Sequence, residues 1–148
     1  MPASHVRQAN RRRPRDRIPK GVWDKDDFLV LYDSGSSLDD SVVFKGDGNK
    51  SGPKVPLTTI DKLVSELKLS KVDFIKMDIE GAERQALSGA RQTIATYKPR
   101  LAIATEHLRD DPEQIPLLVH NLWSGYRMQC GPCYQIQGRI QPDVEYFR

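Results

Sequence analysis

The sequence predicts an α/β fold, with parallel strands joined by helices and an antiparallel hairpin at the C-terminal end. Short apolar segments that suit strands alternate with segments whose apolar residues recur at helical spacing. The tail alternates strand-like pieces with glycine turns. The chain has 148 residues, which is the size of one ordinary domain. Because parallel strands need crossover connections, we expect helices on both faces of the sheet.

The first 20 residues are predicted to be a disordered basic arm that precedes the domain. They hold six arginines, one lysine and one aspartate, without apolar periodicity or aromatic residues. One alternative function follows, a non-catalytic interaction module whose arm contacts nucleic acid or a partner protein. No aromatic platform or groove-entering element accompanies the charge, so nucleic acid is not the expected partner.

Residues 21–148 are predicted to form the domain. A polar turn at 24–27 lies between two apolar pieces and suits a hairpin or strand pair. Residues 33–56 are predicted to be a long loop, either a surface connection or a substrate cover, with a short strand only at 41–44. Thr58 or Thr59 then caps a helix whose apolar residues predict one buried face. These residues are Ile60, Leu63, Val64 and Leu67.

The central part of the chain alternates regularly. Residues 72–79 read as a buried strand, and a helix is predicted at 82–96. A second buried strand follows at 101–105. The next helix carries apolar residues from Ile115 onward, and Pro116 indicates that it starts late. Turns at 131–132 and at 138 then predict the closing hairpin.

Two strand ends carry the side chains that suit chemistry, because ligands of parallel sheets bind beyond the carboxyl ends of the strands. Asp78 and Glu80 are two residues apart after the first buried strand and so point to the same side. Paired carboxylates there can coordinate a divalent metal, accept a hydroxyl proton or hold an ammonium group, or they can simply complement the helix dipole. We assign no residue to a metal site.

Glu106 and His107 follow the second buried strand. An imidazole beside a carboxylate can act as a general base, although a histidine in such a turn is often structural. Cys130 and Cys133 spell the Cys-x-x-Cys redox motif, but a returning strand follows where a redox site needs a helix. We therefore expect a hairpin turn with two free thiols in a cytoplasmic protein.

The sequence resembles the FkbM-type methyltransferase family. The resemblance rests on Pro56-Leu57-Thr58-Thr59-Ile60-Asp61, on Lys76-Met77-Asp78-Ile79-Glu80-Gly81-Ala82-Glu83, on Leu87-Ser88-Gly89-Ala90, on Glu106-His107 after Lys98-Pro99, and on Gly125-Tyr126. It covers about residues 21–147.

The resemblance implies a partial Rossmann-like sheet and transfer of a methyl group from S-adenosylmethionine to a hydroxyl of a sugar or small metabolite. By the same resemblance Asp78, Glu80, Glu106 and His107 would be catalytic, and Asp61 and Asp78 would contact the cofactor.

The glycine-rich turn that would hold the cofactor is not found in this sequence, and residues 1–20 contain no glycine. We therefore expect a fragment-like domain that is inactive alone and binds the cofactor weakly or not at all. An unpaired sheet edge is also expected, which favours self-association. The sequence has no apolar segment long enough to span a membrane, so a cytoplasmic protein without a membrane partner is expected.

Overall fold

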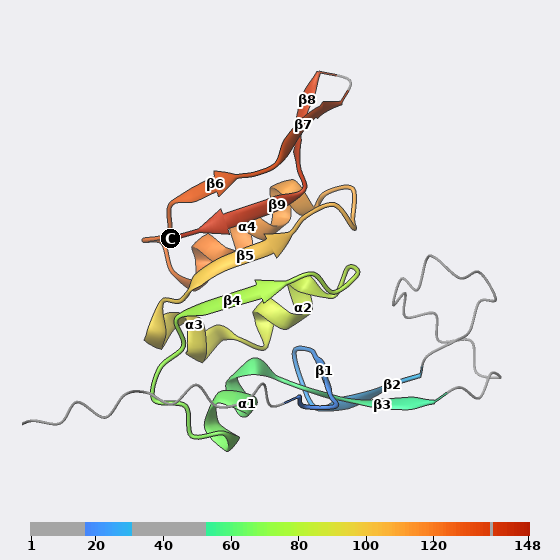
Figure 1. Ribbon diagram of the computed structural model, residues 1–148, viewed down its shortest axis with the longest axis vertical. Helices are drawn as coiled ribbons and strands as arrows, with labels where there is room; N and C mark the ends of the chain where they lie inside the picture. The colour runs from blue at the N-terminus through green and yellow to red at the C-terminus, as the bar shows by residue number, and fades with distance from the viewer. Residues whose placement is uncertain (1–16, 31–52, 137) are drawn as a thin grey trace, which may run out of the picture.

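The computed structural model describes residues 17–30, 53–136 and 138–148 (Figure 1). The basic arm, except for residues 17–20, and the predicted strand at 41–44 lie outside the described residues. The strands are β1 (Gly21–Val22), β2 (Asp27–Val30), β3 (Lys54–Thr58), β4 (Phe74–Met77), β5 (Arg100–Ala104), β6 (Met128–Cys130), β7 (Cys133–Ile136), β8 (Arg139–Pro142) and β9 (Val144–Phe147). The helices are α1 (Ile60–Glu66), α2 (Glu83–Ser88), α3 (Arg91–Tyr97) and α4 (Asp111–Leu122). The fold is therefore a mixture of helices and sheets.

The small N-terminal sheet differs from the predicted hairpin. Its strand order is β1-β3-β2, so β3 lies between the two strands that were expected to pair. β3 was predicted to be the end of a loop, but it pairs parallel with β1 and antiparallel with β2. The residues of the turn between β1 and β2 do not reveal this pairing. The strand that separates them, β3, begins more than 20 residues after the end of β2.

The main sheet has the order β4-β5-β9-β6, with β4 and β5 parallel and β9 antiparallel to β5 and β6. The side chains of α2, α3 and α4 join Leu101 and Ile103 of β5 in one core. On the other face, Phe74 is 51% and Tyr146 45% exposed. Within the described part of the chain, helices therefore cover one face of this sheet, and the expectation of helices on both faces is wrong (Figure 1). β4 is correspondingly half exposed, whereas β5 is buried as predicted.

The helix predicted at 82–96 is two helices, α2 and α3, with a break at Gly89. A Cβ at Gly89 would lie only 2.0 Å from the backbone oxygen of Trp23, so the chain passes too close for any side chain. Asp61 accepts hydrogen bonds from the backbone N–H groups of Gln92 and Thr93 and so satisfies the start of α3. Tertiary contacts therefore break a segment whose apolar spacing alone predicts one helix.

The starts of two helices test what the sequence predicts for helix N-termini. Thr59 caps α1, since its hydroxyl oxygen accepts the N–H of Lys62 at 3.0 Å, and this prediction is confirmed. The late start of the third predicted helix is wrong, because α4 begins at Asp111 and includes Pro116. Pro112 lies in the first turn, where a missing N–H costs nothing, and Pro116 loses only the bond to residue 112.

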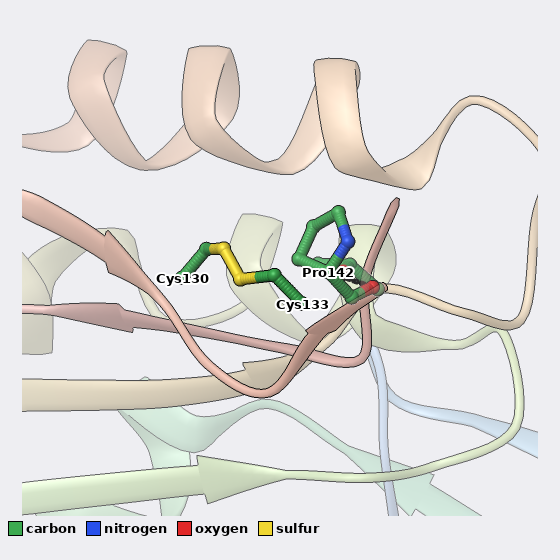
Figure 2. The surroundings of a disulfide bond; sticks show 4 residues. Cys130, Cys133 and Pro142 are labelled. Carbon is green, nitrogen blue, oxygen red and sulfur yellow. Dashed lines mark hydrogen bonds between the residues drawn. A yellow bond between two sulfur atoms is a disulfide. The ribbon is translucent and has the colours of Figure 1, made fainter. Parts of the chain in front are cut away.

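The C-terminal strands are antiparallel, as the sequence predicts, but they form two units. β9 enters the main sheet between β5 and β6, while β7 and β8 form a separate two-stranded ribbon (Figure 1). Cys130 ends β6 and Cys133 begins β7, so the motif lies in a turn between strands, as expected. The two cysteines form a disulfide, so the expectation of free thiols is wrong (Figure 2). The turn brings their Cα atoms to 6.1 Å, which is within the range that a disulfide spans.

Candidate active site

The carboxyl ends of β4 and β5 lie next to each other because the two strands are parallel neighbours. Asp78 and Glu80 follow β4, and Glu106 and His107 follow β5. The backbone turns sharply at Glu80, which has a φ of 55°, and at Gly81, which has a φ of 91°. These two residues occupy the left-handed region, and glycine accepts it without a steric cost. The turn thus holds Glu80 beside the loop that carries His107.

His107 is surrounded by carboxylates. Its Nε2 lies 3.5 Å from Asp78 Oδ1 and 3.6 Å from Glu83 Oε1, and its Nδ1 lies 3.5 Å from Glu80 Oε2. The His107 side chain is 13% exposed, whereas those of Asp78 and Glu80 are about half exposed. The structure therefore brings together three of the four residues that the sequence predicts to be catalytic, in a cluster that is open on the carboxylate side.

Lys76 also touches this cluster. Its ammonium group donates a hydrogen bond to Asp78 Oδ2 at 2.9 Å. This bond is the main reason why the pKa of Asp78 is lowered, and the neighbouring His107 adds to the effect. Asp78 is consequently a carboxylate at neutral pH, with its second oxygen directed toward the imidazole.

Glu106 has a different environment, although it is adjacent in sequence. Its carboxyl group interacts with that of Asp143, and this hydrogen bond is the largest of the causes that raise the pKa of Glu106. Burial and the negative charges of Asp143 and Asp78 raise it further. A carboxyl group with a raised pKa is a stronger base than an ordinary one once it is ionised. No sequence pattern points to Asp143, because this residue comes from the turn before β9 and only the pairing of the sheet brings it to the end of β5.

Glu83 is the second residue whose role the sequence analysis did not identify. In the sequence it appears only within the motif that carries the family resemblance, but its side chain is buried, with 1% exposure. Its Oε1 accepts the N–H of Ile79 at 2.8 Å and so connects the end of β4 to the start of α2. Its Oε2 is buried without a hydrogen-bond partner among the described residues, as is Nε2 of His107. A glutamate at the first position of a helix is common on the surface, so the sequence pattern alone did not reveal its burial.

Ionic contacts between α2 and the start of α4 hold the loop after β5 in place. Arg84 donates to Asp111 at 2.7 Å and to Asp110 at 2.6 Å. Asp111 is buried and also accepts the N–H of Leu108 at 2.9 Å. The hydrogen bond from Arg84 lowers the pKa of Asp110, while the hydrogen bonds to the two aspartates raise the pKa of Arg84. α2 and the start of α4 are thereby connected, which fixes the segment that carries His107.

Asp61 does not share the cluster around His107. Both of its oxygens accept backbone N–H groups at the start of α3, at 2.7 Å and 3.0 Å. These bonds give Asp61 a structural role, and its assignment to the cofactor stays a prediction.

One cavity lies beside this region, next to the start of α2. Its volume is about 120 Å³, and it is lined by Gly21, Val22, Trp23, Leu29, Leu57, Ile79 and Ala82. All of these side chains are apolar or small. Pockets for drug-sized ligands usually enclose roughly 300–1,000 Å³. The cavity is therefore too small for a nucleoside.

No helix in the described ranges 17–30, 53–136 and 138–148 is long and apolar enough to cross a membrane. The basic arm lies almost wholly outside these ranges, so the interaction that the sequence suggested for it stays a prediction.

Residues 7–128 of the chain match the family described as Methyltransferase FkbM domain. The match begins within the segment assigned to the basic arm. A solved structure to which the chain is similar is that of methyltransferase FkbM from Methylobacillus flagellatus KT, with 28% sequence identity and a TM-score of 0.52. The similarity covers 64% of this chain and 24% of that chain, so the present chain matches about a quarter of that protein. A search of curated proteins found no match.

Proposed function

The chain belongs to the FkbM methyltransferase domain family, and from this premise we propose that it methylates a hydroxyl oxygen of a sugar or small metabolite. Members of such a family generally use S-adenosylmethionine as the methyl donor. The observation that supports the proposal is the convergence of Asp78, Glu80 and His107 at the carboxyl ends of β4 and β5. An acceptor hydroxyl can donate a hydrogen bond to the exposed carboxylates at this edge.

The cavity beside the acidic edge does not fit the whole methyl donor. The acidic edge suits an ammonium or hydroxyl group, but the neighbouring cavity of about 120 Å³ has no room for adenosine. We propose instead that this chain supplies the acceptor side of the site and that, alone, it binds S-adenosylmethionine weakly or not at all.

Within this proposal Glu106 is the base that takes the acceptor proton. Both nitrogens of His107 face carboxylates within 3.6 Å, so the imidazole is engaged within the cluster. Glu106 is exposed, and its contact with Asp143 raises its pKa. The roles of the four predicted residues are thus divided. Asp78 and Glu80 hold the acceptor, His107 positions these two carboxylates, and Glu106 accepts the proton.

Calorimetric titration of the 148-residue chain with S-adenosylmethionine tests donor binding. We expect no saturation at micromolar concentrations, and micromolar affinity would contradict this part of the proposal. Methyl transfer to a panel of sugars is then measured with millimolar isotope-labelled donor. Any transfer should fall by roughly 100-fold in Glu106→Gln, which removes the base. The control is Glu113→Gln, an exposed change on α4 that should leave the rate unaltered.

The assignment of the base and the catalytic activity of the isolated chain can be refuted separately. Equal rates for the wild type and Glu106→Gln would refute the assignment of the base. Absence of transfer even at millimolar donor would exclude catalysis by this chain alone, while its place in the family would stand.

A further inference from the structure

We propose that Asp78, Glu80 and His107 form a binding site for one divalent transition-metal ion of the Mn²⁺ type. Each residue offers one ligand atom, and the three atoms lie within 4.8 Å of one another. Two carboxylate oxygens and one imidazole nitrogen form a mixed ligand set. Carboxylates suit Mn²⁺ and imidazole suits first-row transition metals, whereas a pure Mg²⁺ or Ca²⁺ site would be built from oxygen alone.

The buried carboxylate of Glu83 is an independent indication of a cation. Glu83 is 1% exposed, and its Oε2 has no hydrogen-bond partner in the described part of the chain. Its other oxygen lies 3.6 Å from His107 Nε2, on the inner side of the cluster. A buried carboxylate oxygen without a hydrogen-bond partner is costly, so a positive centre nearby would offset the cost. Metal-binding histidines are commonly oriented by such an outer carboxylate.

The local charge balance favours a cation as well. Three carboxylates surround His107, and Lys76 contacts one of them, that of Asp78. Lys76 binds Oδ2 of Asp78, which leaves Oδ1 on the side of the imidazole. A proton on the imidazole is the competing way to supply positive charge. Unlike a bound metal ion, a protonated imidazole would give no saturable binding.

The metal site extends the proposed function. Its role in methyl transfer rests on that function, but the binding of the ion does not. Three protein ligands leave coordination positions open, and Asp78 and Glu80 are about half exposed, so these positions face the solvent. Oxygen atoms of a hydroxylated acceptor can occupy them. A bound cation lowers the pKa of a hydroxyl that it coordinates, which would ease proton loss to Glu106. The expected acceptor therefore offers two neighbouring oxygens.

Titration of the full chain with MnCl₂, followed by the electron paramagnetic resonance signal of free Mn²⁺, tests the site without donor or acceptor. We expect one saturable equivalent per chain. Glu80→Gln and His107→Ala should each weaken binding by at least about tenfold. His120→Ala and Glu113→Gln are matched controls on the exposed face of α4 and should bind as the wild type does. Circular dichroism confirms that each variant is folded.

A spectroscopic readout identifies the ligand directly. Bound Mn²⁺ should show spin-echo modulation from an imidazole nitrogen, which persists in His120→Ala and disappears in His107→Ala. Failure to saturate at millimolar Mn²⁺ would overturn the metal site. So would an affinity for Mn²⁺ in Glu80→Gln and His107→Ala that equals that of the wild type. Neither result depends on methyl transfer, so the metal site can fail while the proposed function stands, and the reverse also holds.

Discussion

Glu83 Oε1 lies 3.6 Å from His107 Nε2 and also accepts the backbone N–H of Ile79 at 2.8 Å. One buried carboxylate therefore connects the end of β4, the start of α2 and the imidazole that follows β5. This contact fixes the relative position of the two strand ends that carry the candidate site, and it makes Glu83 a structural as well as an electrostatic component.

Replacing Glu83 by alanine should destabilise the protein. The variant leaves the Ile79 N–H without its acceptor and removes a fully buried side chain. We expect the free energy of unfolding to fall by about 2 kcal/mol. Urea denaturation measures this change, and Glu113→Ala on the exposed face of α4 is the control, which should change stability by about 0.5 kcal/mol or less. Equal stability of the two variants would contradict the role of Glu83.

The stability of the chain should fall as the pH rises from about 5 to 8 because of Glu145 on β9. Glu145 is 2% exposed, and burial, with a smaller contribution from Asp111, raises its pKa from 4.5 to about 7. A raised pKa in the folded state means that the folded protein favours the protonated acid. The stability that protonated Glu145 contributes to the folded protein is complete below pH 4.5. It is lost as the pH passes 7.

The size of this pH effect is at most about 3 kcal/mol. Glu145→Gln is neutral at every pH, so its free energy of unfolding should lack this component. Urea denaturation of both proteins at pH 5 and pH 8 provides the comparison. The difference between variant and wild type should be larger at pH 8, and a constant difference would show that Glu145 titrates normally.

Asp61 should stabilise the fold through α3. In Asp61→Ala the backbone N–H groups of Gln92 and Thr93 lose their acceptors, and we expect a loss of about 1 kcal/mol. Asp61→Asn keeps one side-chain oxygen for the Thr93 N–H and should lose less. Denaturant titration ranks the three proteins, and the order wild type, asparagine, alanine is expected. An alanine variant as stable as the wild type would contradict this capping role.

The outer edge of β4 should promote self-association. β5 is the sole partner of β4 in the described sheet, and Phe74 on β4 is 51% exposed. We expect the apparent mass from light scattering to rise with protein concentration. Phe74→Lys should reduce the rise, because a charged edge residue opposes strand pairing. Leu117→Lys, a similarly exposed position on α4, should not reduce it. A wild type that is monomeric at all concentrations would count against this prediction.

The local predictions succeeded where short-range physics decides the structure. Thr59 caps α1 because a side-chain oxygen can reach an N–H three residues away, and β5 is buried as its apolar run predicts. The predictions that failed concern contacts between distant segments. Gly89 breaks a helical pattern because the backbone of Trp23 approaches it, and β3 inserts between β1 and β2.

The sequence by itself determined the family, the α/β alternation and the position of Asp78, Glu80, Glu106 and His107 at strand ends, because motifs and periodicity are local properties. Only the tertiary structure decided that Asp78, Glu80 and Glu83 surround one imidazole and that Asp143 lies against Glu106. These groups come from different strands and loops. Their distances, and hence the shifted pKa values of Asp78 and Glu106, depend on how β4, β5 and β9 pair.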